Sequence, residues 1–463
     1  MRPLAILLLG FALRATIIVS NPIIWGGDTI MRLFDRHTLV KAHQLPLLQV
    51  FISGISMISI DPALVRYMVA VLGAVAGLGF YWVVADLFGE EWAFPGALLF
   101  VTHPYVLAVS TVPFQEILML ACLTFAFHFL YTQRWLMASL CLAAACLTRY
   151  EAWAACPVFA SAYILRQDRS FIGIVKAALL FGWMPVAWIL ACHGLTPAGH
   201  FVINRSISIW RFQRYVYLGW ITVKFTQIPV LFLAGAGAWR LYKNRSSIDW
   251  RLWVQIAFLA LFAIAVLFSA HGMPPDPGRF VTSREARLLI YLVLLVAVLG
   301  LVQWPRWSPA MVGLSAVLGI GGAFWYVHVA TSAPDVQLDY RVAQYLDNSL
   351  RDGERVLILA RPVTEDWTLY LDKARKTGGE EGLRQAQLQL QELAAMAPDY
   401  QRVAVHSRLG RERLLAPPAP CGEWVAVWNN YPDVARELAV PEPVQVLRSG
   451  PMSVSILRRQ CSR

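Results

Sequence analysis

The feature that most constrains this chain is a succession of apolar segments that fills residues 1–330. Of its 463 residues 57% are apolar and 15% are charged, whereas soluble domains carry about 25% charged residues. So many apolar side chains exceed what a globule can bury, and the excess must face lipid. The sequence therefore predicts a mainly α-helical, polytopic integral membrane protein.

Eleven segments are predicted as helices that cross or partly enter the membrane, since about 20 apolar residues span the hydrocarbon. They lie at residues 3–20, 64–86, 92–111, 115–131, 134–147, 151–165, 171–192, 216–240, 251–270, 287–303 and 308–329. Two of them are short and flank a polar break, LTRYE at 147–151. Charged residues are costly inside lipid, so we place this break at a membrane surface.

The first long loop, residues 21–63, contains an acidic and basic stretch, WGGDTIMRLFDRH, followed by HQLPLLQVFISGISMISID. The second stretch is apolar over about 14 residues, which is too short to span a membrane comfortably. We expect it to form a helix that lies along the membrane interface.

Residues 331–463 have a different composition and are predicted to form a separate water-soluble domain. They hold 17 basic and 17 acidic residues, so the net charge of +11 belongs to residues 1–330. Their pattern predicts an α/β fold with strands at 356–360, 402–407, 424–429 and 454–459, and helices at 339–350, 380–396 and 433–438. Cys421 and Cys461 are candidates for a disulfide in an oxidising compartment.

The basic excess of the membrane half predicts anionic partners at the membrane, either lipid headgroups or a phosphate-bearing substrate. Nucleic acid is not expected, because the basic residues lie in short loops between apolar helices. The Arg/Lys clusters at 166–170 and 239–251 indicate cytoplasmic loops. An odd number of spans then places the N-terminus in the cytoplasm of a plasma (inner) membrane protein, with the 21–63 loop and the C-terminal domain outside.

In this topology acidic and basic residues gather at the outer face and few charges remain at mid-membrane. The outer acidic residues are Asp28, Asp35, Asp61, Glu116, Glu151, Asp276 and Glu285. A transporter would instead place ionisable groups near the midplane, often at broken helices. An enzyme that works at the outer surface fits this distribution better.

Several short motifs, taken in order, resemble the GT-C superfamily of glycosyltransferases, which includes protein O-mannosyltransferases and lipid A aminoarabinose transferases. The matching features are Asp28 after the first span, His43 and Pro46 at the start of the interfacial stretch, Arg66 and LFG (87–89) in the next span, Pro104 followed by STVPFQE with Glu116, LTRYEAW (147–153), and Arg287 at the start of a late span before a small outer domain. The pattern departs from the family at Thr29, where a second acidic residue often stands, and at His-Gln-Leu-Pro, where His-Pro-Pro is familiar. The resemblance covers nearly the whole chain.

The resemblance implies a polyprenyl-phosphate-linked sugar donor and an acceptor lipid, glycan or protein. It implies catalytic roles for Asp28 and Glu116, and substrate binding by Arg66, Arg149, Arg284, Arg287 and His43. An outer site has no supply of nucleotide sugars, and the sequence contains no Asp-x-Asp to hold a metal–nucleotide. Arginines suit a phosphate leaving group and a carboxylate suits an acceptor hydroxyl, which predicts direct displacement with inversion.

Structural alternatives exist for the same residues. Asp28 and Glu116 could each cap a helix, and Arg149 with Glu151 could form a structural ion pair. Cofactors are not predicted, although Asp28, Asp35, His37 and His43 could hold a divalent metal ion. At the level of function, the alternatives are a transporter or lipid flippase, and an O-antigen-ligase-like enzyme.

Overall fold

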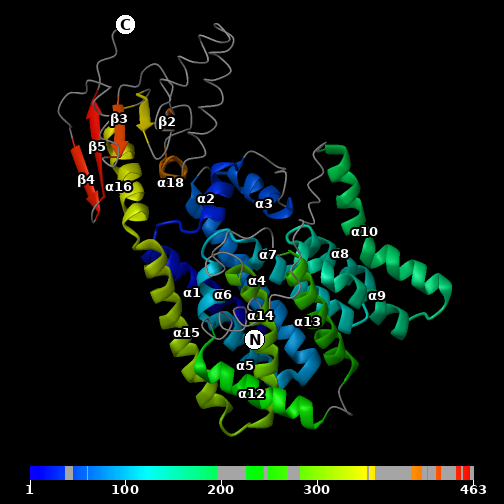
Figure 1. Ribbon diagram of the computed structural model, residues 1–463. Helices are drawn as coiled ribbons and strands as arrows, with labels where there is room; N and C mark the ends of the chain where they lie inside the picture. The colour runs from blue at the N-terminus through cyan, green and yellow to red at the C-terminus, as the bar shows by residue number, and fades with distance from the viewer. Residues whose placement is uncertain are drawn as a thin grey trace. The chain divides into compact units, whose positions relative to one another are not determined.

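The computed structural model describes residues 1–36, 45–59, 61–195, 226–244, 249–269, 282–351, 354–359, 398–408, 414–415, 424–428, 445–449 and 452–458. The chain is mainly helical and divides into two compact units (Figure 1). The first unit comprises Met1–Ser20, His37–Ile55 and Ala63–Tyr326, and the second comprises Asn21–Arg36, Ser56–Pro62 and Val327–Arg463. The first long loop is thus shared between the two units.

The first unit is a bundle of helices that follows the predicted apolar segments. Its helices are α1 (Arg2–Ser20), α3 (Leu47–Ser56), α4 (Pro62–Phe88), α5 (Glu90–Thr102), α6 (Pro104–Val109), α7 (Gln115–Tyr131), α8 (Trp135–Cys146), the 3₁₀ turn η1 (Tyr150–Ala154), α9 (Ala155–Arg166), α10 (Phe171–Leu195), α12 (Ile228–Lys243), α13 (Trp250–Ser269), α14 (Thr282–Gln303) and α15 (Ser308–Thr331). By length and composition, four stretches of the described chain could cross a membrane: Arg2–Ser20, Pro62–Phe88, Phe171–Ala191 and Ser308–Thr331. The count of eleven spans stays a prediction.

The predicted span at 92–111 is interrupted at His103, where α5 ends and α6 begins. His103 has extended backbone angles (φ −58°, ψ 127°), and Pro104 is the first residue of α6. Proline disfavours the helical conformation in the residue before it and has no N–H to donate. The break therefore follows directly from the sequence, although hydropathy alone conceals it.

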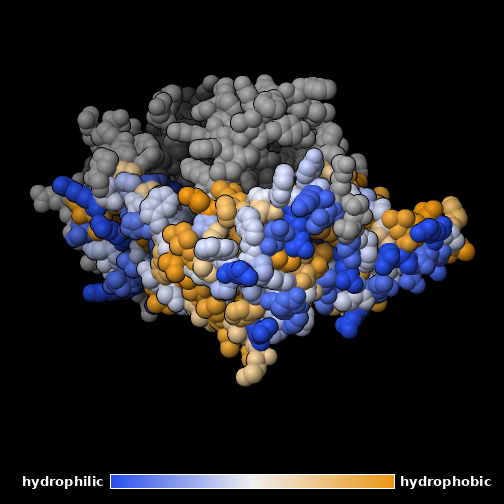
Figure 2. Space-filling model, turned by 90° about the horizontal axis from the view of Figure 1, so that it is seen from below, coloured by the Kyte–Doolittle hydropathy of each residue, from blue (hydrophilic) through white to orange (hydrophobic). Residues whose placement is uncertain are grey.

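Glycines allow two helices of the first unit to approach closely. A Cβ atom on Gly237 of α12 would lie 1.9 Å from the carbonyl oxygen of Val296, and one on Gly300 of α14 would lie 2.1 Å from that of Leu233. Only glycine permits this backbone-to-backbone contact, which is a common means of packing helices in membranes. Outside the packed faces, apolar side chains such as Leu179 (66% exposed) remain on the surface, and Figure 2 shows apolar and hydrophilic residues side by side on the face seen from below.

The second unit contains a five-stranded mixed sheet in the order β2-β1-β3-β5-β4. The strands are β1 (Val356–Leu359), β2 (Leu414–Leu415), β3 (Trp424–Trp428), β4 (Gln445–Ser449) and β5 (Met452–Arg458). β1 pairs in parallel with β2 and β3, while β5 runs antiparallel to β3 and β4. The helices of this unit are α2 (Gly27–Phe34), α16 (Pro334–Ser349) and α18 (Pro398–His406), and α16 packs against β4, β5 and α18.

One predicted strand is wrong: residues 402–407 belong to the helix α18. A short apolar run does not distinguish strand from helix, and Pro398, the first helical residue, is well suited to starting one. Tertiary contacts then favour the helix, because Arg402 donates from Nε to the fully buried Asp339 (2.5 Å) and also pairs with Asp335 (3.1 Å). The predicted helices at 380–396 and 433–438, and both Cys421 and Cys461, lie outside the described residues.

Candidate functional site

A single loop, which joins α6 to α7, provides the partners of two buried arginines. Arg14 of α1 donates from Nε to the hydroxyl oxygen of Ser110 (2.5 Å) and from a terminal nitrogen to the carbonyl oxygen of Gly10 (2.7 Å). Arg66 of α4 donates from Nε to the carbonyl oxygen of Thr111 (2.9 Å). Both guanidinium groups are almost completely excluded from solvent. The loop therefore fixes two cations from two different helices.

The same loop leads into Glu116, which holds a third arginine. Glu116 accepts from a terminal nitrogen of Arg149 (2.7 Å), and Glu151 accepts from Nε of Arg149 (3.1 Å) and from its other terminal nitrogen. Glu116 and Glu151 are buried, and the Arg149 side chain is 11% exposed. The structure thus contains the ion pair between Arg149 and Glu151 that was considered as a structural alternative, and Glu116 forms a second ion pair with the same arginine. We call Arg14, Arg66 and Arg149 the arginine cluster.

The polar break at 147–151 is also where the predicted interfacial helix docks. The backbone N–H of Leu47, the first residue of α3, donates to the carbonyl oxygen of Leu147 (3.0 Å). The hydroxyl of Thr148 donates to the carbonyl of Ala145 (2.5 Å), so the C-terminal carbonyl groups of α8 find partners. This contact joins the first loop to the segment that carries Arg149.

Asp28 lies in the first turn of α2, which belongs to the second unit. The N-cap of this helix is Gly26, whose positive φ of 90° favours glycine, so Asp28 is not the N-cap residue. The segment is held by α18: the backbone N–H of Ile24 donates to Nε2 of His406 (2.9 Å), and the rings of Phe34 and Tyr400 meet edge to face at 5.8 Å. The backbone that carries Asp28 is therefore fixed by the C-terminal part of the chain, while its side chain lies outside the described residues.

The structure brings some of the predicted site residues together and leaves others undescribed. Glu116 and Arg149 are in contact, and Arg66 bonds to the loop that leads to Glu116. Glu116 follows the N-cap Phe114 in the first turn of α7, so it is not an N-cap residue either. Arg284 and Arg287 lie near the start of α14, but their side chains are outside the described part of the structure. His43 lies outside the described residues.

The four residues considered as metal ligands are only partly described, because His37 and His43 fall in residues 37–44. Within the described ranges, no group of three or more His, Cys, Asp or Glu side chains could hold a metal ion.

Arg14 is the functional candidate that sequence reasoning missed. It is fully buried, and its remaining terminal nitrogen has no hydrogen-bond partner among the described residues. A buried cation is costly unless an anion compensates it. The available signal was a single arginine in the interior of an otherwise apolar first span.

Comparison with solved structures supports the predicted resemblance at the level of the fold, a helical bundle followed by a small mixed sheet. ArnT from Cupriavidus metallidurans in the apo state matches with a TM-score of 0.59 and 11% identity, over 98% of this chain and 97% of that chain. ArnT from the same organism bound to undecaprenyl phosphate matches with a TM-score of 0.57 and 12% identity over the same shares. At such low identity the likeness establishes the fold alone.

A weaker likeness, with a TM-score of 0.43 and 14% identity, relates 76% of this chain to 60% of the Archaeoglobus fulgidus oligosaccharyltransferase in complex with Zn and sulfate. That score is too low to establish a shared fold. No protein-family model matches the chain, and no curated protein matches it by sequence.

Proposed function

We propose that this protein is an integral membrane glycosyltransferase that transfers a sugar from a polyprenyl-phosphate-linked donor to an acceptor lipid, glycan or protein. The observation that carries the proposal is the end-to-end likeness to ArnT, one structure of which holds undecaprenyl phosphate. The likeness covers 98% of this chain, so it is not confined to the helical bundle. We take this extent as support for a shared type of reaction.

The arginine cluster supports the choice of donor. Transfer from a lipid phosphate releases an anionic leaving group, whose charge must be stabilised as the bond to the sugar breaks. Guanidinium groups suit this task because they present several N–H donors in a planar fork. Buried arginines held by one loop, with Arg284 and Arg287 at the start of α14 as further candidates, would provide such groups.

Asp28 is our candidate for the general base. Its carboxylate would accept the proton of the acceptor hydroxyl as the oxygen attacks the sugar carbon, and the configuration at that carbon would invert. Gly26 and Gly27 precede it and allow a substrate to approach the backbone closely. Glu116, in contact with Arg149, is the second candidate.

The proposal includes the predicted topology: about eleven spans in the plasma (inner) membrane, a cytoplasmic N-terminus, and residues 331–463 as an extracytoplasmic α/β domain. The site then faces the compartment in which polyprenyl-linked sugars, rather than nucleotide sugars, are the donors.

Binding of undecaprenyl phosphate to the purified full-length protein tests the donor assignment. Charge-assisted hydrogen bonds contribute about 1.5–3 kcal/mol each, so undecaprenyl phosphate should bind at least about tenfold more tightly than undecaprenol. Arg66→Gln, Arg284→Ala and Arg287→Ala should weaken that binding, whereas Arg169→Gln, an exposed arginine, should not. Equal affinity for the two lipids would contradict the proposal.

A further inference from the structure

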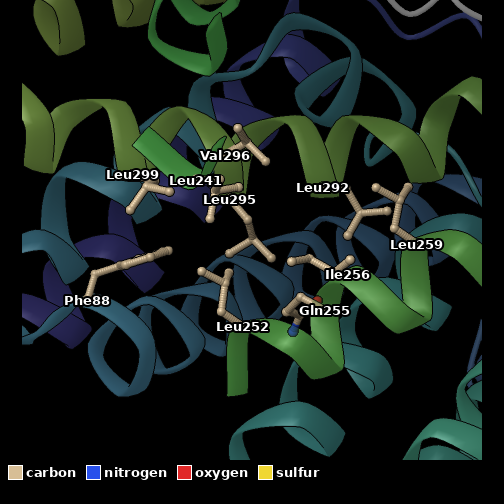
Figure 3. Close-up of a pocket in the computed structure, with 10 residues that line it drawn as sticks. All are labelled: Phe88, Leu241, Leu252, Gln255, Ile256, Leu259, Leu292, Leu295, Val296 and Leu299. Atoms are coloured by element: carbon tan, nitrogen blue, oxygen red, sulfur yellow. The ribbon is translucent and has the colours of Figure 1, made fainter. Parts of the chain in front are cut away.

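An apolar pocket lies in the first unit between α12, α13 and α14, well away from the arginine cluster. It is lined by Phe88, Leu241, Leu252, Gln255, Ile256, Leu259, Leu292, Leu295, Val296 and Leu299. The space between these side chains, including the part that is open to solvent, is about 370 Å³. Figure 3 shows side chains of α13 and α14 pointing toward one another, with Phe88 and Leu259 at opposite ends of the group.

This pocket is separate from the proposed donor site. Phe88 is the last residue of α4, and Arg66 lies near the start of the same helix. At a rise of 1.5 Å per residue, the two positions are about 33 Å apart along the helix. In a membrane, α4 would place them toward opposite surfaces, so a phosphate bound near Arg66 could not also lie beside Phe88.

The lining of the pocket favours a hydrocarbon chain. Nine of its ten residues are apolar, and Gln255 already donates from Nε2 to the hydroxyl oxygen of Tyr131 (2.6 Å). A headgroup or a sugar would lose its hydrogen bonds with water in such a space, and among the described lining side chains it could replace only one, with Oε1 of Gln255, which has no partner there. A flexible acyl chain loses none, and burying it there is favourable.

Basic residues adjoin lining residues of the pocket in sequence. Arg240 and Lys243 lie in the last turn of α12 on either side of the lining residue Leu241. Arg251 precedes the lining residue Leu252. One terminal nitrogen of Arg251 donates to the carbonyl oxygen of Asp86 (2.7 Å), and its Nε nitrogen has no hydrogen-bond partner among the described residues. These cations are complementary in charge to a phosphate at the end of a bound acyl chain.

Exposed aromatic residues on the same helices indicate that this end lies at a membrane interface. Trp239 and Tyr242 of α12 are 64% and 69% exposed, and Trp253 of α13 is 51% exposed. Tryptophan and tyrosine are enriched at headgroup level, where the ring contacts lipid and the polar atom reaches water. The phosphate of a lipid would lie at this same depth.

We propose that the pocket between α12, α13 and α14 binds an acyl chain of an anionic glycerophospholipid, whose phosphate is held by Arg240, Lys243 and Arg251. The bound lipid would fill the space between α13 and α14, so this second lipid site is structural and independent of the donor site.

Photo-crosslinking in vesicles tests the proposal. The full-length protein is reconstituted in phosphatidylcholine vesicles that contain a minor share of phosphatidylglycerol with a diazirine in its acyl chain, and labelled peptides are identified by mass spectrometry. Peptides of α13 and α14 should be labelled in preference to those of α15, and more strongly than by the matching phosphatidylcholine probe. The Arg240→Gln/Lys243→Gln variant should lower the preference by about fivefold for each residue replaced.

Two indole substitutions separate the pocket from general lipid contact. Ile256→Trp fills the pocket and should abolish labelling of α13 and α14, whereas Leu318→Trp adds the same ring at an exposed position of α15 and should change nothing. Equal labelling by the two lipids in the wild type, or unchanged labelling in folded Ile256→Trp protein, would overturn the proposal. If Ile256→Trp does not fold, the Arg240→Gln/Lys243→Gln variant provides the test. An unchanged preference of this variant for phosphatidylglycerol over phosphatidylcholine would also overturn the proposal.

Discussion

Arg149 is held by two buried carboxylates, and this arrangement predicts a large effect of replacing it. Arg149→Gln leaves Glu116 and Glu151 buried without their cation, which typically costs about 3–5 kcal/mol. We expect a clear loss of thermal stability in detergent, and recovery of part of it in the Arg149→Gln/Glu116→Gln variant. Arg169→Gln, at an exposed loop position, should change stability by no more than about 0.5 kcal/mol. Unchanged stability of Arg149→Gln would show that these ion pairs do not form.

At the residue scale, the sequence predicted the acidic and basic residues of interest but not their partners. Glu116 and Arg149 were separate candidates, and their contact joins residues 33 positions apart. The bond from Arg14 to Ser110 joins residues 96 positions apart, so no local pattern could reveal it. The sequence also could not show whether Asp28 is the N-cap of its helix. Two glycines precede it, and only the backbone conformation shows that Gly26 is the N-cap.

The close contact of α12 and α14 provides a test at the scale of the elements. Gly237→Ala would place a methyl group against the carbonyl oxygen of Val296, and overpacking of this kind costs about 1–3 kcal/mol or more. Gly235→Ala lies two residues away on the same helix and meets nothing within 4 Å, so it should be neutral or slightly stabilising. The melting temperatures of the two purified variants should differ by several degrees, and equal values would refute the helix contact.

Helices of the bundle were predicted well because their apolar runs are long. The exceptions have local causes: Pro104 divides one predicted span, and residues 402–407 form a helix because Arg402 is held by acidic residues of α16. In the sheet, β2 and β4 were missed, since β2 has two residues and β4 has a partly exposed, weakly apolar sequence. Hydrophobic periodicity therefore predicts the helices of the bundle better than the strands of the C-terminal sheet.

At the scale of the whole molecule, the topology predicts which residues share a side of the membrane. In a cysteine-free background, Asp61→Cys and Arg351→Cys should both react with a membrane-impermeant maleimide added from outside. Both positions are exposed. Arg169→Cys, in a predicted cytoplasmic loop, should react only after the membrane is opened. Labelling of just one of the first two would show that the predicted orientation is wrong.

The measurement that tests the central claim most directly is the release of free polyprenyl phosphate by the reconstituted protein. The substrate is a panel of undecaprenyl-phosphate-linked sugars in vesicles that also contain a total lipid and glycan extract as acceptor. The wild-type protein should release undecaprenyl phosphate from at least one donor. Asp28→Asn, which keeps the shape and removes the base, should fold, bind undecaprenyl phosphate normally and turn over about 10²–10⁴-fold more slowly. Near-normal turnover of Asp28→Asn would transfer the base role to Glu116. If intact donor lipid moves across the bilayer and no undecaprenyl phosphate is released from any donor of the panel, the account is contradicted and the protein is a flippase instead.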